Sequence, residues 1–179
     1  MSEAATGSAP RPPADAFGRL LFRCVEGVAL AGGAVLFAMT LMSVASILGR
    51  ALFSKPLQGD YELAQTGVAI AVAAFLPYCQ MRGGHVFVDF FTAGLPSRAR
   101  GALDAVGALA IAVIGFVVAW RMGYGLVDLR AAHDQSMILA IPTWYSFVAM
   151  IPCFALLGVT AAYTALSRWR DAMRRGGRE

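Results

Sequence analysis

Four long stretches without a charged residue constrain this chain more than any other feature of its sequence. They cover residues 27–49, 63–81, 105–120 and 135–167. An α-helix rises about 1.5 Å per residue, so about 20 apolar residues cross the hydrocarbon core of a membrane. The third stretch reaches this length if its helix continues through Arg121, whose long side chain can extend to the membrane surface. The sequence therefore predicts an all-α integral membrane protein with four transmembrane helices.

The composition agrees with this fold class. Hydrophobic residues make up 58% of the 179 residues and charged residues only 15%. A water-soluble domain needs more charge to cover its surface. We expect a disordered tail, rich in Ala, Pro and Ser, followed by a membrane domain with a short amphipathic lead-in and then a basic tail. The first tail would comprise residues 1–16, the membrane domain residues 17–168 and the basic tail residues 169–179. Within the membrane domain, the lead-in would cover residues 17–26, and the spans would lie near residues 27–49, 63–81, 105–127 and 142–167.

Basic residues are divided unequally between the two sides of the predicted membrane. Residues 1–26, 82–104 and 168–179 hold eleven of the 15, and the connections 50–62 and 121–134 hold four. Because cytoplasmic segments carry an excess of Lys and Arg, both termini are predicted to be cytoplasmic. The net charge of +4 therefore reflects orientation in the membrane and does not indicate a nucleic-acid-binding face.

Two of the predicted spans begin with recognisable signals. Asp60 is expected to cap the second helix, and Glu62 is favoured at the positive end of that helix. Pro142 is expected to mark a helix start or a kink near one membrane surface. Trp144 and Tyr145 follow it and fit an aromatic belt at the outer surface.

The segment between spans two and three has a polar stripe at helical spacing. Arg82, His85, Asp89 and Thr92 are separated by three, four and three residues, and phenylalanines fill much of the opposite arc. This pattern predicts a short amphipathic helix on the cytoplasmic surface. Two candidate ligands, His85 and Asp89, are too few for a zinc site. A surface hydrogen bond or a partner contact is therefore the simpler interpretation.

Polar side chains within the predicted spans are few. None is a carboxylate near the membrane centre, where carriers place carboxylates, broken helices or proton relays. Hydroxyl groups in such helices usually bond to their own backbone or to a neighbouring helix. We therefore predict that the chain alone carries no substrate and supplies no catalytic, cofactor or metal ligand. The polar residues considered in the spans are Thr40, Ser43, Ser46, Gln65, Thr66, Ser146, Thr160 and Thr164.

Small residues recur at spacings of four in the spans. This spacing places them on one helix face, where a second helix can approach closely. The sequence leaves open whether that helix belongs to this chain or to a larger partner. The pairs are Gly67 with Ala71, Ala69 with Ala73, and Ala108 with Ala112.

Three segments carry a resemblance to a known family. They are Gly49-Arg50 to Leu63 (with Gly59-Asp60-Tyr61-Glu62), Gly84-His85-Val86 to Asp89 followed by Leu95-Pro96, and Ser136 to Trp144. In this order, across residues 17–168, they resemble the small membrane subunit, DctQ type, of tripartite ATP-independent periplasmic (TRAP) transporters. One departure concerns span two, because the family often has tryptophan before the acidic position where this chain has Asp60-Tyr61.

The resemblance implies a non-enzymatic protein of the bacterial inner membrane. Members of this family pair with a large multi-span permease subunit that holds the substrate and sodium sites, and a periplasmic binding protein delivers the substrate, usually an organic acid. The small subunit would brace the static scaffold against which the large subunit's transport domain moves like an elevator, with membrane lipids between them. Structural or interface positions would be Arg50, Glu62, Arg82, His85, Asp89, Pro142 and Trp144.

Other classes of function are also compatible with a small four-span protein. The small subunit of tripartite tricarboxylate transporters is one, although its pattern lacks the segment from His85 to Asp89. A four-helix membrane oxidoreductase is disfavoured because the cysteines are scattered and neither histidine lies in a span. A small drug exporter would need a membrane-embedded glutamate, whereas Glu26 lies at the edge of span one. The sequence does not identify the solute.

Overall fold

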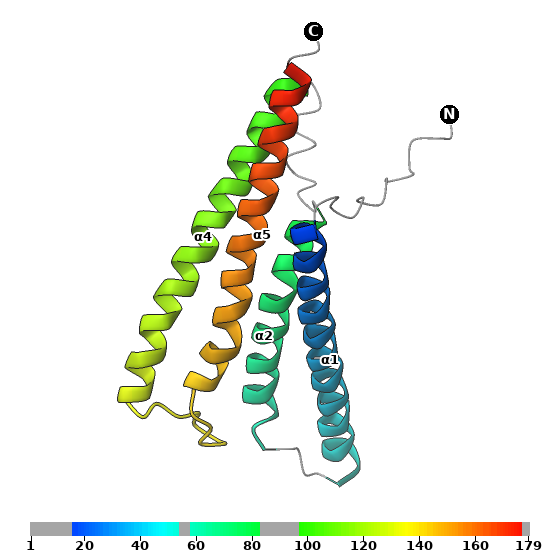
Figure 1. Cartoon of the computed structure of the whole chain (residues 1–179). Coiled ribbons are helices and arrows are strands. Elements are labelled where there is room, and N and C mark those ends of the chain that lie inside the picture. Colours follow the sequence, from blue (N-terminus) through cyan, green and yellow to red (C-terminus); the bar gives the residue numbers. More distant parts are fainter. Residues whose placement is uncertain (1–15, 54–57, 83–96, 177–179) are drawn as a thin grey trace, which may run out of the picture.

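The computed structural model describes residues 16–53, 58–82 and 97–176. Nearly all of them lie in four helices: α1 (Ala16–Phe53), α2 (Asp60–Met81), α4 (Ser97–Ala131) and α5 (Trp144–Gly176) (Figure 1). All 4 are long and apolar enough to cross a membrane, and the described residues contain no β-strand. The predicted all-α fold with four transmembrane helices is confirmed. The predicted interfacial helix falls on residues 83–96, which lie outside the described part of the chain.

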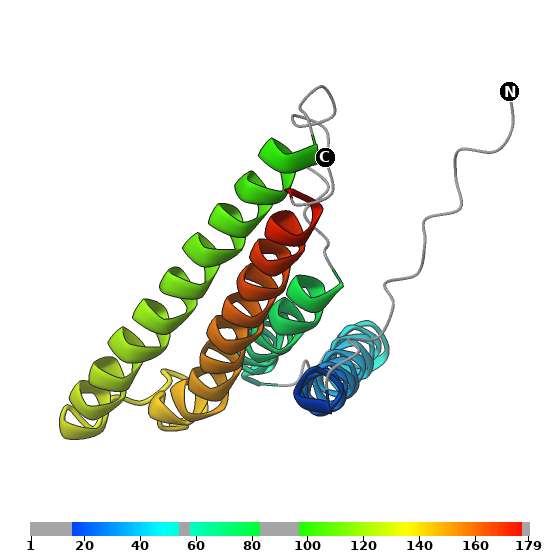
Figure 2. The same ribbon diagram turned by 45° about the horizontal axis from the view of Figure 1, so that its top comes forward.

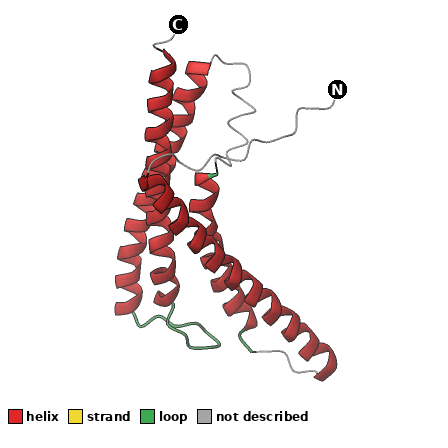
Figure 3. Ribbon diagram, turned by 45° about the vertical axis from the view of Figure 1, so that its right-hand side comes forward, coloured by secondary structure: helices red, strands yellow, loops and turns green. Residues whose placement is uncertain are grey.

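The four helices form one open layer. Along the layer α4 packs against α5, α5 against α2, and α2 against α1 (Figures 1 and 2). The helices diverge toward the end that carries the α1–α2 and α4–α5 connections (Figure 3). Because a layer leaves two broad faces uncovered, large apolar side chains such as Leu30, Phe37 and Ile47 are more than half exposed. In a membrane these faces contact lipid or partner helices.

Small residues form the contact between α4 and α5. A Cβ atom added to Gly115 would lie 2.9 Å from the backbone nitrogen of Gly158, so the two backbones touch at this point. Alanines continue the contact along both helices, and the absence of larger side chains allows the close approach. The buried alanines are Ala105, Ala108 and Ala112 on α4 and Ala161 and Ala165 on α5.

The contact between α1 and α2 is built in the same way. A Cβ atom at Gly32 would lie 2.7 Å from the Cβ of Ala74, and one at Gly67 would meet the Met39 side chain at 2.5 Å. Ala71 and Ala74, the two residues of α2 that lie against Gly32, are buried. The sequence left open whether these small residues pack against a helix of this chain or of a larger partner. The buried ones pack within the chain.

The helices extend further than the predicted spans. The predicted lead-in, residues 17–26, is not a separate surface segment but the first part of α1, and its Leu21 and Val25 are buried. The Phe17 ring lies 6.0 Å from the Tyr163 ring of α5. Once formed, a helix gains a hydrogen bond with each added residue, so an apolar lead-in that finds packing partners continues the helix. With 38 residues, α1 is about 57 Å long, and it either tilts or projects beyond the hydrocarbon core.

Candidate functional site

The start of α2 is attached to the end of α1 by a side-chain hydrogen bond. Gly59, with φ +77°, occupies the N-cap position of α2. The prediction that Asp60 caps this helix is therefore wrong. Asp60 is the first residue of the helix, and its carboxylate accepts hydrogen bonds from the Ser46 hydroxyl (2.5 Å) and the Tyr61 N–H (2.8 Å). Because glycine tolerates a positive φ, it can replace a side-chain cap, and Asp60 is free to bind α1.

The carboxylate of Glu62 binds the connection between α4 and α5. It accepts hydrogen bonds from the Ser136 hydroxyl and from the backbone N–H groups of Ile138 (3.0 Å) and Leu139 (3.2 Å). The connection is folded back on itself, since the Ser136 N–H donates to the Ile141 carbonyl at 2.9 Å. Its N–H groups therefore converge on Glu62. We call this group of Glu62, Ser136, Ile138 and Leu139 the clasp.

Gly59 is required at the clasp for a second reason. A Cβ atom at this position would overlap the Leu139 side chain. The positive φ and the contact with Leu139 therefore both favour glycine at this position. The clasp brings together two of the segments that carry the family resemblance, although 74 residues separate Glu62 from Ser136 along the chain.

The hydrogen bonds of the clasp connect α2 to the α4–α5 connection. Three hydrogen bonds occupy three of the roughly four acceptor positions of the Glu62 carboxylate. Sequence reasoning identified Glu62 but missed Ser136, Ile138 and Leu139 as its partners. The only indication of this contact in the sequence was the predicted topology, which placed residues 50–62 and 121–134 on the same, outer side of the membrane.

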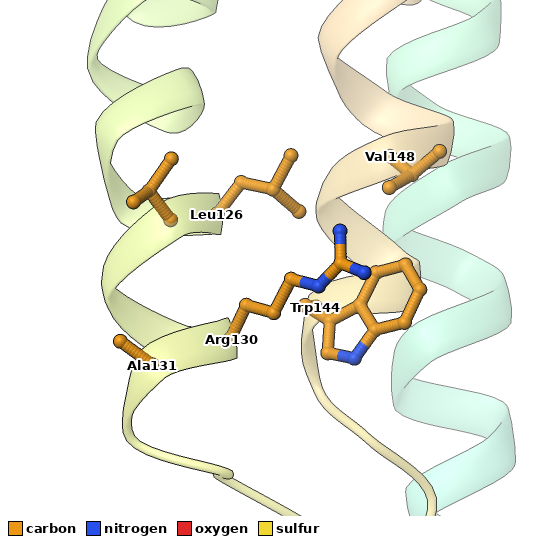
Figure 4. Close-up of a pocket in the computed structure, with 6 residues that line it drawn as sticks. Leu126, Arg130, Ala131, Trp144 and Val148 are labelled. Atoms are coloured by element: carbon orange, nitrogen blue, oxygen red, sulfur yellow. The ribbon is translucent and has the colours of Figure 1, made fainter.

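The start of α5 lies beside the clasp. Trp144 is its first residue, two residues after Pro142, so of the predicted helix start or kink near this proline the structure shows a helix start. Gln135 and Pro142 form an antiparallel bridge that closes the connection. The Trp144 ring stacks on Tyr145 with centroids 4.1 Å apart, and the Arg130 guanidinium carbon lies 5.2 Å from the Trp144 ring centroid (Figure 4).

The remaining candidate positions lie outside the clasp. Arg50 is exposed in the last turn of α1, where a cation is favoured by the helix dipole. The Arg82 guanidinium carbon, at the other end of α2, lies 5.0 Å from the Tyr78 ring centroid and 5.9 Å from that of Phe22 on α1. Cation–π contacts of this kind join the two helices. His85 and Asp89 lie outside the described residues.

Three of the predicted span hydroxyls bond to the backbone of their own helix, and a fourth, that of Ser46, bonds to Asp60 on the neighbouring helix. The hydroxyl of Thr40 donates to the Leu36 carbonyl at 2.9 Å. Those of Thr160 and Thr164 donate to carbonyls three and four residues earlier, at 2.9 and 2.8 Å. Within the described part of the chain, no group of three His, Cys, Asp or Glu side chains is placed to hold a metal ion.

Comparison with known proteins gives one match. A sequence model for the DctQ component of tripartite ATP-independent periplasmic transporters matches residues 39–171, about three quarters of the chain. No curated protein and no solved structure matches. The matched region contains both sides of the clasp as well as Arg82, Pro142 and Trp144.

Proposed function

Because this chain belongs to the DctQ family of tripartite ATP-independent periplasmic transporters, we propose that it acts as the static scaffold of such a transporter. It is a small transporter subunit of the inner membrane and not an enzyme. Family membership separates it from the tricarboxylate transporter subunit, the oxidoreductase and the small drug exporter, which the sequence had left as alternatives.

The open layer of helices is the observation that carries the proposal. An elevator-type transport domain needs a broad apolar surface that stays fixed in the membrane while the domain moves. The layer offers two such faces, and the buried small residues fix the helices to one another. A substrate or sodium site would need several oxygen ligands aimed at one point. The hydroxyls of Thr40, Thr160 and Thr164 are instead bonded to their own helices.

The proposed partners follow from this role. A large multi-span permease subunit would hold the substrate and sodium sites, and a periplasmic binding protein would deliver an organic acid to it. Arg50, Glu62, Arg82, Pro142 and Trp144 would then be structural or interface positions. His85 and Asp89, in the segment predicted as an interfacial helix, would contribute to the same interface.

The proposed orientation places both termini in the cytoplasm. The start of α1 and the end of α5 lie at the same end of the layer (Figure 1). Eleven of the 15 basic residues belong to the segments assigned to that side. The clasp would then face the periplasm, on the side from which the binding protein approaches.

Reconstitution of the complete transporter tests the proposal. Uptake should be lost when this chain is omitted, because the large subunit loses its fixed partner. Thr40→Ala and Thr160→Ala should leave the apparent affinities for sodium and for substrate within about threefold, a change of less than about 1 kcal/mol. A tenfold loss of either affinity with the complex still assembled would show that the transport site extends into this chain, and the scaffold role would be wrong.

A further inference from the structure

A recess opens between α4 and α5 beside the clasp. Its volume is about 450 Å³, and Leu126, Val127, Ala131 and Val148 line it together with Arg130 and Trp144. Figure 4 shows the Arg130 side chain extending from α4 toward Trp144 on α5. Arg130 lies in the last turn of α4 and Trp144 is the first residue of α5. The recess is therefore apolar on the side of the spans and cationic at the end of the helices.

The guanidinium of Arg130 can bind an anion while it contacts the indole. A cation–π contact uses the face of the guanidinium, and its N–H groups point outward in the plane, where they can hold two oxygens of a phosphate. Among the described residues, no carboxylate lies within ion-pair distance of Arg130. Asp128 is exposed and only two residues away, so it points to a different side of α4.

The depth of the recess matches the headgroup region of a membrane. Trp and Tyr concentrate at the boundary between hydrocarbon and water, and Trp144 and Tyr145 are stacked at this end of α5. From there Leu126, Val127 and Val148 lead toward the hydrocarbon core. An amphipathic occupant, with an anionic group at the arginine and a hydrocarbon chain below it, satisfies both ends of the recess.

We propose that the recess is a binding site for a membrane phospholipid. Arg130 binds the phosphate of the headgroup, Trp144 positions the guanidinium, and an acyl chain lies against the valines and Leu126. With the termini in the cytoplasm, the lipid belongs to the outer leaflet. The site does not depend on the scaffold role, because it requires only that the four helices span a membrane.

Native mass spectrometry of the purified full chain tests the site with defined ligands. The probes are phosphatidylglycerol, phosphatidylethanolamine, diacylglycerol and inorganic phosphate. Both phospholipids should bind more tightly than diacylglycerol, and inorganic phosphate should neither bind measurably nor displace them. Arg130→Gln should weaken phospholipid binding about tenfold, the loss expected when a charge-assisted pair of hydrogen bonds is removed. It should leave diacylglycerol binding unchanged.

Two further variants separate headgroup binding from general effects. Arg121→Gln is the matched control, because it removes the same charge from the same helix about two and a half turns away, on the opposite side. It should leave phospholipid binding unchanged. Val148→Trp fills the recess and keeps Arg130, so it should weaken binding of the phospholipids and of diacylglycerol alike.

The proposal is overturned if Arg130→Gln binds phosphatidylglycerol like the parent chain, or if Arg121→Gln loses as much affinity as Arg130→Gln. It is also overturned if Val148→Trp leaves lipid binding intact. Displacement of the lipid when the large permease subunit is added would show that the recess accepts a protein side chain instead.

Discussion

Replacement of Gly115 by larger residues should force α4 and α5 apart. An added Cβ atom would lie 2.9 Å from the backbone nitrogen of Gly158, 3.1 Å from its Cα and 3.2 Å from the Phe154 carbonyl oxygen. All three neighbours are backbone atoms, which cannot rotate away as a side chain can. Ordinary contact distances require the helices to separate by about 0.5–1 Å, and overpacking of this kind typically costs about 1–3 kcal/mol. Gly115→Leu should cost more than Gly115→Ala.

Two glycines in the same helix provide matched controls. A Cβ atom added to Gly107 or to Gly123 meets nothing within 4 Å. Ala favours a helix over Gly by up to about 1 kcal/mol, so Gly107→Ala and Gly123→Ala should be neutral or slightly stabilising. The difference between Gly115→Ala and these controls isolates the steric cost. Gly158→Ala should cost less than Gly115→Ala, because its Cβ atom would meet the Phe116 ring, which can rotate.

The free energy of unfolding of the full chain, measured by reversible SDS titration in mixed micelles, provides the assay. Gly115→Ala should be less stable than Gly123→Ala by about 1–3 kcal/mol. Equal stability of the two variants, or a Gly115→Leu variant as stable as the parent chain, would refute the inference that the helices touch at this point.

Three further predictions concern other parts of the layer. Glu62→Gln should accelerate hydrogen exchange of the backbone amides in residues 136–139, because an amide side chain accepts fewer of the hydrogen bonds of the clasp; Glu26→Gln, an exposed control, should leave these rates unchanged. Asp104→Asn should lower the free energy of unfolding by about 0.5–1 kcal/mol by removing the 3.1 Å ion pair with Arg168. Arg168→Gln should add nothing further, and additive losses would show that the pair is not coupled. Reporter fusions in the α4–α5 connection and at the C-terminus should report opposite sides of the membrane, and the same side for both would contradict the proposed orientation.

The sequence by itself determined the number of spans and their approximate positions, and it predicted a helix start or a kink near Pro142. These are local properties, because the length of an apolar run and the fixed φ of proline act on the residues that carry them. The order of the Gly59–Glu62 and Ser136–Trp144 segments along the chain also predicted the family, which the match over residues 39–171 supports.

Only the tertiary structure decided how the spans are arranged and what the polar residues at their ends contact. Asp is a residue type that often caps helices, but in this chain Gly59, with a positive φ, occupies the cap position. The Asp60 carboxylate instead accepts a hydrogen bond from Ser46. Four amphiphilic or apolar helices are equally compatible with a closed bundle and with an open layer. The difference lies in which small residues meet, as Gly115 and Gly158 do across α4 and α5. Such contacts join residues that are distant in sequence, so no local pattern specifies them. In a membrane the lipid is as apolar as the helix surface, so the hydrophobic effect does not select the neighbouring helix. Packing alone selects it.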